Sequence, residues 1–463
     1  MERIIQSGVI KALGLCLLSS AAHAGGFSLY TEGSTSELSV FAAGSAAEAP
    51  DASTAWYNPA GLVLLPKREI VLNGIGIVPS TKLSGQSTFT TVDDPPIPPY
   101  RQNFEGLESG QRAFLPTIHG VYPLGEKSAF GFSILMPYGL SSDWPGDSPL
   151  RYAGTYTELL TLDISPDIAG YITDNLSIGL GLDLQFAKVS FNAVAGSPAE
   201  LDFFHSMGGI PTATFLDSRS ENTGNSFGIG FHGGLLYMFN HGKSRLGFNF
   251  QSAVQHEFRG TSTLTGRLAD PDLENPEAVY ELDTLSSNQL RLPNVTTLSF
   301  YHEATDKFVV LGSAVLTGWG VFENTLLTDV AGFDVDEGVQ APIDILTEQQ
   351  YRNAWRFALG GTYALNDRWT ARFGGGYDQT PTVDQERDAR LPDVNRWAVA
   401  FGLYYHPRPT VMFNAGYVYL WGEGKTPVNK TQIINNKSSV TVTGWGTAHA
   451  QLAGLQVVWR PLE

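Results

Sequence analysis

The chain has 463 residues, of which 16% are charged, and a formal net charge of −17 at pH 7. So acidic a protein is a poor partner for nucleic acid, and we expect none. Cys16 is the only cysteine, which excludes a disulfide framework and cysteine-based zinc sites. The nine histidines show no metal-ligand spacing, so we expect neither a metal nor a cofactor.

The first 24 residues are typical of a secretory signal peptide. Arg3 and Lys11 precede an apolar run at 12–18, and the small-x-small tripeptide Ala-His-Ala at 22–24 is a cleavage site. The apolar run is too short to span a bilayer as a helix. We therefore expect residues 1–24 to be removed.

Residues 25–67 form a segment of small and polar residues that tolerates helix and shows no strand pattern. Its Asn58-Pro59-Ala60 stretch favours a turn, because asparagine before proline initiates turns. The rest of the chain, 68–463, is rich in strands that suit a barrel. A wide barrel has a lumen that its own side chains do not fill, so we expect the N-terminal segment to be a small hatch inside it.

Long segments with alternating apolar and polar residues follow one another from residue 69 to the end. Alternation with period two, bounded by turn residues, is typical of antiparallel strands. The pattern predicts an all-β, 14-stranded antiparallel transmembrane barrel. The predicted strands are 69–85, 114–124, 128–144, 158–173, 176–195, 226–239, 244–266, 292–305, 308–328, 351–365, 369–381, 395–407, 410–427 and 446–459.

The connections between these strands alternate between tight turns and long loops. Turns such as 125–127 and 173–175 contrast with loops such as 86–113 and 196–225. Short periplasmic turns and long extracellular loops characterise barrels of the bacterial outer membrane. We therefore expect the protein to lie in the bacterial outer membrane, in contact with membrane lipid and lipopolysaccharide. We also expect it to be a monomer.

Alternation along the last strands places aromatic residues on one face and arginines on the other. Trp397 and Phe401 share the predicted outer face, whereas Arg356, Arg372 and Arg396 would project into the lumen. A guanidinium could bind a ligand carboxylate. The alternative is a structural ion pair with the hatch or with a lumen carboxylate such as Asp183 or Asp378. We favour this alternative for any one of the three arginines. A soluble β-sandwich also alternates, but it fits fourteen such long strands poorly.

The strand predicted at 128–144 contains Pro137, Tyr138 and Gly139 near its middle. Proline donates no ladder hydrogen bond and glycine weakens a strand, so the stretch predicts a kink. In hydrocarbon, unpaired backbone is tolerated only where protein covers it or a cavity lies beside it. We interpret the kink as a lateral opening. The alternative is a β-bulge at the extracellular rim.

The loop at 196–225 is too apolar to be freely solvated. Exposed apolar patches mark binding sites, so we expect a surface groove for an acyl chain there, facing the loop at 267–291. The alternative is that the two loops only pack on each other as a lid. The residues predicted to line the groove are Leu201, Phe203, Phe204 and Met207.

Two enzyme-like patterns occur and are dismissed. Residues 224–228 satisfy G-x-S-x-G around Ser226, but they lead into a strand and not into a helix. Residues 228–233 satisfy the dinucleotide pattern inside a strand, with no βαβ unit around it. We therefore do not expect an enzyme. A third functional class, an outer-membrane lipid enzyme, would require that Ser226→Ala abolishes an enzymatic activity and leaves transport intact.

Several motifs, taken together in their order and spacing, resemble those of a known protein family over essentially the whole chain after the signal peptide. The motifs are Gly26-Phe27, Asn58-Pro59-Ala60, Tyr138-Gly139-Leu140, the run 352–381 and Leu-Pro-Asp-Val-Asn-Arg-Trp at 391–397. The chain resembles the outer-membrane transporters of long-chain fatty acids and aromatic hydrocarbons (FadL/TodX-like).

This resemblance implies a fourteen-stranded barrel with an N-terminal hatch that includes Phe27 and residues 58–60. It also implies capture of an apolar ligand by loops, a pocket in the lumen and lateral exit beside the kink. We expect long-chain fatty acids as ligands. The alternatives are monoaromatic hydrocarbons by the same route and, in a different class, a water-filled general porin.

Overall fold

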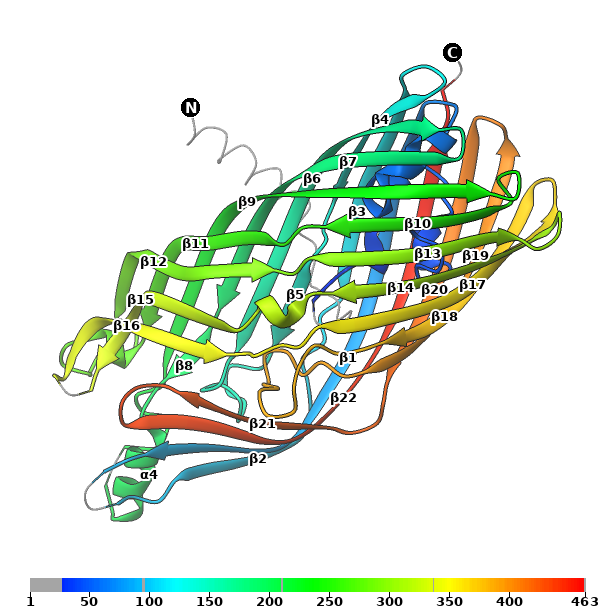
Figure 1. The fold of residues 1–463 in the computed structure, drawn as a ribbon. Helices are drawn as coiled ribbons and strands as arrows, with labels where there is room; N and C mark the ends of the chain where they lie inside the picture. The colour runs from blue at the N-terminus through cyan, green and yellow to red at the C-terminus, as the bar shows by residue number, and fades with distance from the viewer. Residues whose placement is uncertain (1–26, 94–95, 210, 336, 462–463) are drawn as a thin grey trace.

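A computed structural model describes residues 27–93, 96–209, 211–335 and 337–461 of the chain, so the predicted signal peptide lies outside the described residues. Within these ranges, twenty-two strand segments form one sheet. The sheet closes into an antiparallel barrel, with the N-terminal segment, in dark blue, inside it (Figure 1). The closed 14-strand architecture predicted from the sequence is confirmed.

Each barrel strand is one strand segment or two segments in line. In chain order they are β1 (Glu69–Thr91), β3 (Ala113–Pro123), β4 with β5 (Ser128–Leu135, Gly139–Asp143), β6 (Tyr156–Thr173), β7 (Leu176–Phe191), β9 (Ser218–Phe239), β10 with β11 (Ser244–Gln251, Val254–Thr265), β12 with β13 (Val279–Leu292, Val295–Glu303), β14 with β15 (Phe308–Thr317, Asn324–Asp334), β17 (Ala354–Asn366), β18 (Trp369–Asp378), β19 (Arg396–Arg408), β20 (Val411–Gly422) and β22 (Ser438–Trp459).

The first and last strands close the barrel. β1 pairs with β22 along an antiparallel ladder that runs from Ile70 opposite Trp459 to Thr91 opposite Ser438. Closure leaves no free sheet edge at this seam, which a hydrocarbon environment requires. The ladder begins at the rim that carries the short turns, because Glu69 of β1 lies opposite Val121, near the end of β3.

The two faces of the strands differ as the alternation predicts. Trp397 and Phe401 of β19 are 46% and 59% exposed on the outside of the barrel. Their neighbours Arg396 and Ala400 are buried in the interior. The wall therefore presents an apolar surface to lipid and a mixed surface to the lumen.

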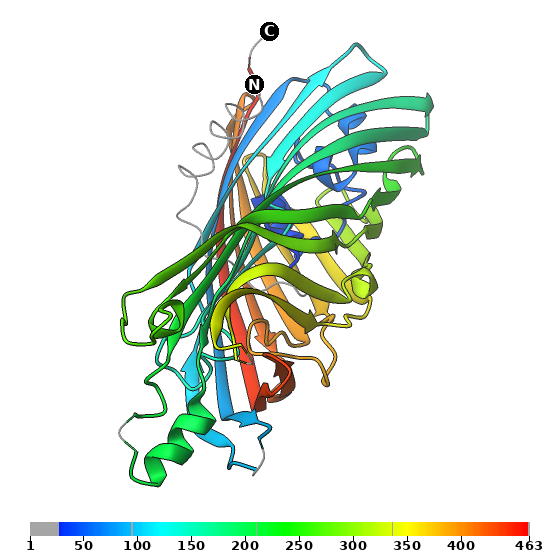
Figure 2. The ribbon, with the colours of Figure 1, turned by 90° about the vertical axis from the view of Figure 1, so that its left-hand side faces the viewer.

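Several segments that the sequence analysis treats as long loops are ordered strands, and there the prediction was wrong. Their residues continue the ladders beyond the membrane, where both faces carry polar side chains and the apolar alternation fades. Figure 2 shows that α4 lies at the far end of the molecule, beyond the barrel wall. The added strands are β2 (Tyr100–Glu108), β16 (Val339–Glu348) and most of β21 (Thr426–Ile433), and the predicted loops also contain α4 (Pro198–Ser206) and η3 (Arg267–Ala269). Two further short elements, β8 (Ala193–Ala195) and η4 (Trp319–Val321), lie within segments predicted as strands.

The N-terminal segment inside the barrel, residues 27–65, is called the hatch below. It contains η1 (Thr31–Gly33), α2 (Thr35–Leu38), α3 (Thr54–Tyr57) and η2 (Pro59–Leu64). Leu38, Val40 and Phe41 are fully buried and belong to one apolar cluster with residues of the barrel wall. Among the described helices, none combines the length and the apolar run needed to cross a membrane.

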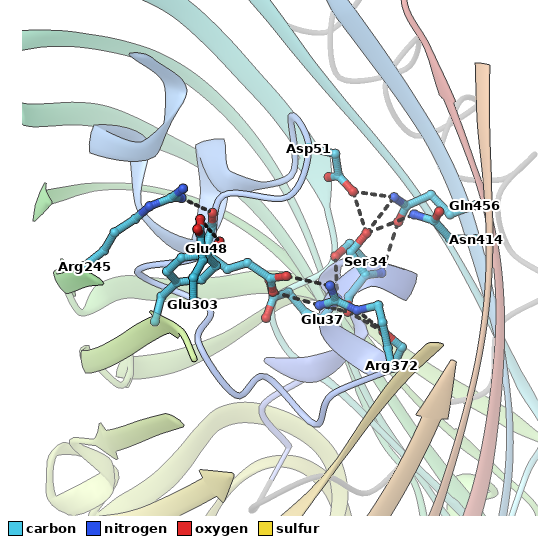
Figure 3. Close-up of polar contacts among 12 residues, drawn as sticks. Ser34, Glu37, Glu48, Asp51, Arg245, Glu303, Arg372, Asn414 and Gln456 are labelled. Atoms are coloured by element: carbon cyan, nitrogen blue, oxygen red, sulfur yellow. Dashed lines mark hydrogen bonds and ion pairs between the residues drawn. The ribbon is translucent and has the colours of Figure 1, made fainter. Parts of the chain in front are cut away.

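Polar side chains of the wall also bind the hatch. Gln456 of β22 accepts a hydrogen bond from the Thr35 backbone N–H at 3.0 Å and donates to Asp51 at 2.7 Å (Figure 3). Asn58 donates from Nδ2 to the carbonyl oxygens of Ala46 and Leu235, at 2.6 and 3.1 Å. Buried polar groups of the hatch are thus satisfied across the lumen, as burial requires.

Glycines of the wall allow the hatch backbone to approach closely, and we expect Gly247→Ala to weaken its packing. A methyl group on Gly247 would overlap the Ala46 carbonyl oxygen of the hatch. Overpacking of this kind costs about 1–3 kcal/mol. Limited proteolysis should therefore cut the hatch faster in Gly247→Ala than in the parent protein.

Gly76→Ala is the matched control, because the nearest atom to its new methyl group, the Ala453 carbonyl oxygen, is 3.9 Å away. Equal cleavage rates in the two variants would contradict the close contact at Gly247.

Candidate functional site

The barrel wall is interrupted between β4 and β5. β4 ends at Leu135 and β5 begins at Gly139, so Met136, Pro137 and Tyr138 form the break that the sequence predicts. Pro137 has no N–H to give to a ladder. The β3–β4 ladder stops at Ile118 opposite Ile134.

Beyond the break, β5 pairs with β6 from Gly139 opposite Leu160 onward. In the described residues no ladder joins β5 to β3. On that side, residues 113–117 of β3 thus lack a strand partner, whereas on the other side they pair with β1. The break therefore leaves an unpaired edge in the wall.

The start of the hatch covers the break from inside. The Leu29 N–H donates to the Pro137 carbonyl at 2.9 Å, and the Gly139 N–H donates to the Phe27 carbonyl at 2.9 Å. Ser28 and Tyr138 form an isolated antiparallel bridge between these two bonds. The backbone groups that the kink removes from the wall are therefore satisfied by the hatch.

An aromatic cluster fixes this contact. The Phe27 ring centroid lies 4.4 Å from that of Trp319 and 6.2 Å from that of Tyr138. Tyr138 donates from its hydroxyl to the Pro293 carbonyl at 2.7 Å. Phe27 and the kink, which the sequence analysis singles out separately, therefore meet at one place.

A small pocket of about 60 Å³ lies beside the break. Phe27 of the hatch and Leu140 of β5 both line it, and further apolar walls come from β6, which pairs with β5, and from β7, β11 and β12. These walls are Leu159, Val189, Phe258, Leu290 and Leu292. We call this space the inner pocket.

A larger cavity of about 370 Å³ lies among the extracellular extensions of the strands. It is lined by apolar residues of β15 and β16, by Leu268 of η3, and by residues near Ile434. We call it the outer cavity. The two spaces adjoin, because four residues line both of them. These residues are Phe191, Thr325, Gln349 and Arg390.

The four residues predicted for a loop groove lie at or beside α4, outside the described lining of the outer cavity. Leu201 and Phe203 are half-buried, whereas Phe204 and Met207 are 58% and 70% exposed. Of the same loop, Gly196 and Ser197 do line the cavity. A role of α4 in capturing ligand stays a prediction.

The three predicted lumen arginines are all engaged in ion pairs. Arg356 and Arg396 share the carboxylate of Asp378, each at 3.1 Å. Arg372 binds Glu48 of the hatch at 2.6 Å (Figure 3). These contacts are those of the structural alternative; a role for any of the three in binding a ligand carboxylate stays a prediction.

The other carboxylate suggested as a partner of these arginines, Asp183, pairs with His232 instead, with 2.6 Å between Asp183 Oδ1 and His232 Nδ1.

Asn58, Pro59 and Ala60 form the junction between two hatch helices. Asn58 caps η2, because its side-chain oxygen accepts from the Ala60 N–H at 3.1 Å, and Pro59 occupies the first helical position. The Ala60 carbonyl accepts from the Ser177 hydroxyl of β7 at 2.8 Å. The predicted turn thus binds the hatch to the wall.

Sequence reasoning missed Arg390, which lies in the connection between β18 and β19 and lines both spaces. A signal was present, because the arginine stands between the apolar Ala389 and Leu391, both of which are buried. Among the described residues, no cluster of histidine, cysteine and carboxylates could hold a metal ion.

Comparison with known proteins gives relatives over the whole length. A long-chain fatty acid transport protein of Salmonella typhi is 26% identical over 420 residues, which are 89% of this chain and 91% of that protein. Outer membrane protein P1 of Haemophilus influenzae is 28% identical and covers 99% of both chains.

Solved structures share the fold. The crystal structure of a Pseudomonas aeruginosa FadL homologue has a TM-score of 0.78 at 24% identity, covering 94% of this chain and 99% of that one. The toluene transporter TbuX of Ralstonia pickettii has a TM-score of 0.63 at 18% identity, covering 92% and 98%.

The family described as outer membrane protein transport protein (OMPP1/FadL/TodX) matches residues 15–460. Together with the barrel, its hatch and the broken strand, this match shows that the chain belongs to that family of outer-membrane transport proteins.

Proposed function

We propose that the protein carries long-chain fatty acids passively from the outer cavity, through the inner pocket, to the break between β3 and β5. The observation that carries this proposal is continuity. The outer cavity and the inner pocket share lining residues, and the pocket shares Phe27 and Leu140 with the covered break. Two relatives of comparable length that are named for long-chain fatty acid transport support the choice of ligand.

The height of the break along the barrel axis favours a lateral opening in the membrane and argues against the alternative, a β-bulge above the membrane. On the unpaired edge of β3, Phe114 points outward and is 50% exposed. On neighbouring β1, the outward Val78 next to this level is also apolar and exposed, and the polar Ser80 and Lys82 follow only beyond it. The edge thus borders the apolar band, where a ligand that prefers lipid to water can leave.

The physical driving force suits a ligand with a long alkyl chain. Each CH₂ group that moves from water into an apolar environment contributes about 0.8 kcal/mol. A step from loop cavity to pocket to membrane therefore runs downhill without an energy source. The hatch must first leave the break, because Phe27 and Leu29 occupy its backbone groups.

Monoaromatic hydrocarbons are the second candidate ligand. The inner pocket is small and is lined by Phe27, Phe191 and Phe258, so a single ring suits it. Uptake of radiolabelled oleate and toluene by cells that express the protein and lack other such transporters distinguishes the two.

Straightening the kink tests the exit. In the double variant Pro137→Val, Gly139→Val, β4 and β5 can form one continuous strand with a ladder to β3. We expect oleate uptake to fall at least about tenfold, as when an obligatory route closes, while binding to purified protein persists.

The matched control for this variant is Gly76→Val, Pro79→Val on β1, which changes the same residue types in an unbroken strand. Unchanged uptake in the kink variant would show that ligand does not leave through this break.

A further inference from the structure

A row of aromatic side chains crosses three neighbouring strands on the outside of the barrel. Tyr377 of β18 lies opposite Trp397 of β19, which in turn lies opposite Trp421 of β20. Trp397 and Trp421 are 46% and 37% exposed. Such aromatic girdles mark the boundary between hydrocarbon and head groups. The row stands near the strand ends that carry the long connections, so it marks the extracellular boundary.

A polar cavity of about 380 Å³ lies directly beyond this row. Its lining comes from the segments that precede β17 and that follow β18 and β20, and we call it the rim cavity. Glu423 of the lining is joined to the row, because its carboxylate accepts from Trp397 Nε1 at 3.1 Å and from the Tyr377 hydroxyl at 3.3 Å. The rim cavity therefore lies at head-group level, beside the lipid-facing side of the wall.

Two cations that line the rim cavity have no anionic partner. Arg352 and Lys425 are exposed, and neither forms an ion pair with a carboxylate of the described residues. The Arg352 guanidinium donates from Nε to the Thr380 carbonyl at 3.4 Å, and its two Nη nitrogens have no protein partner there. The Lys425 ammonium lies over the Trp445 ring, 3.7 Å from its centroid. The rim cavity thus offers charged donors that the protein itself does not use.

The acidic residues of the rim cavity are already engaged. Asp384 forms an ion pair with Arg387 at 2.6 Å. Glu423 accepts a third hydrogen bond, from Asn395 Nδ2 at 3.3 Å. Three basic and two acidic side chains line the cavity, which leaves one excess positive charge on a protein whose formal net charge is −17. This local charge favours an anionic ligand.

We propose that the rim cavity binds a phosphate group on the head of lipopolysaccharide. This phosphorylated glycolipid forms the outer leaflet of the bacterial outer membrane, so its phosphates lie at the level of Arg352 and Lys425. Arginine binds phosphate through paired hydrogen bonds, and lysine binds it as a point charge. The volume of the cavity is within the range of small-ligand sites. The acyl chains then lie along the outer wall below the row, past the exposed Val399 and Phe401.

Titration of the purified protein in detergent with diphosphoryl lipid A, and with the same lipid A after phosphatase treatment, tests this assignment. For Arg352→Gln, Lys425→Gln we expect affinity for diphosphoryl lipid A to fall about 30-fold, because each cation near a charged membrane surface contributes about fivefold. Each single variant should lose about fivefold. Affinity for the dephosphorylated lipid should stay the same in all three variants.

The matched control is Arg368→Gln, Arg408→Gln. It removes two exposed arginines at the opposite, short-turn ends of the same strands, and neither of them forms an ion pair among the described residues. The change in net charge is therefore identical, and only the place differs. We expect the control variant to bind both forms of lipid A as the parent protein does.

Four outcomes would overturn the assignment. Unchanged affinity for diphosphoryl lipid A in the rim variant shows that its phosphates bind elsewhere. An equal loss for both forms of lipid A shows that the two residues only shape the surface. An equal loss in the control variant shows attraction by overall charge and not by a site. Inorganic phosphate that binds the parent protein as tightly as diphosphoryl lipid A shows a site for free phosphate.

Discussion

Oxidation of a Ser28→Cys, Tyr138→Cys variant should stop fatty acid uptake, and reduction should restore it. The two residues face each other in an antiparallel bridge, flanked by hydrogen bonds of their neighbours. In such a non-hydrogen-bonded pair the Cα atoms lie about 4.5 Å apart, which is within the range of a disulfide. The bond would hold the hatch on the break permanently.

The expected effect is near-complete loss of radiolabelled oleate uptake in oxidised cells, with at least about tenfold recovery after dithiothreitol. The disulfide closes the route, because it must break before ligand can pass. Disulfide reduction is far slower than thermal opening of the two hydrogen bonds that hold the hatch on the break in the parent protein. The only native cysteine, Cys16, lies in the predicted signal peptide, so the engineered pair has no competitor in the mature chain.

The reduced double variant and the single variant Tyr138→Cys are the controls, because both carry the same truncation of Tyr138. The single variant Ser28→Cys controls for the change at the hatch. Full uptake by protein that mass spectrometry shows to be cross-linked would mean that the hatch does not need to leave the break.

Removal of the Arg372 guanidinium should open the lumen to water. Its two nitrogens Nη1 and Nη2 bind the Glu48 carboxylate at 2.6 and 2.8 Å, and Nε donates to the Ser39 hydroxyl at 2.9 Å (Figure 3). Arg372→Met leaves Glu48 buried without a cation, which costs about 3–5 kcal/mol. Because the hatch can avoid this cost by leaving the lumen, the variant should admit small sugars.

Swelling of liposomes in sugar solution measures the opening. We expect slow swelling with the parent protein and a clear increase with Arg372→Met. The double variant Arg372→Met, Glu48→Gln should swell less than the single variant, since it removes both charges of the pair and leaves no unpaired carboxylate at position 48. Arg259→Met, which breaks an ion pair whose arginine side chain is 77% exposed, should have no effect. Rapid swelling with the parent protein would instead indicate a general porin.

The barrel itself could be predicted because its signals are local. Trp397 and Arg396 are adjacent in the chain and point to opposite sides, so alternation alone assigns their faces. The same reasoning failed at β16, where Gln340 and Asp344 alternate with residues that are also partly exposed. Outside the membrane neither face must be apolar, and the pattern that identifies a strand weakens.

The candidate site could be predicted only in pieces. Proline and glycine revealed the break at residues 137–139, and family motifs pointed to Phe27, but nothing in the sequence placed one against the other. Arg390 was missed because a single arginine in a loop carries no periodic signal. Its position depends on Thr157, which accepts a hydrogen bond from the guanidinium at 2.8 Å and lies 233 residues away in the chain.

The sequence by itself determined the closed barrel, the faces of its strands and the position of the broken strand. Each depends on residue types within one strand or one turn, where hydrogen-bond geometry and exclusion of water act over a few residues. The tertiary structure alone decided that Phe27 covers the break, that Glu48 pairs with Arg372, and that Arg390 stands where the outer cavity meets the inner pocket. These contacts depend on which residues ring closure brings together across the lumen, and no local pattern in the chain specifies that.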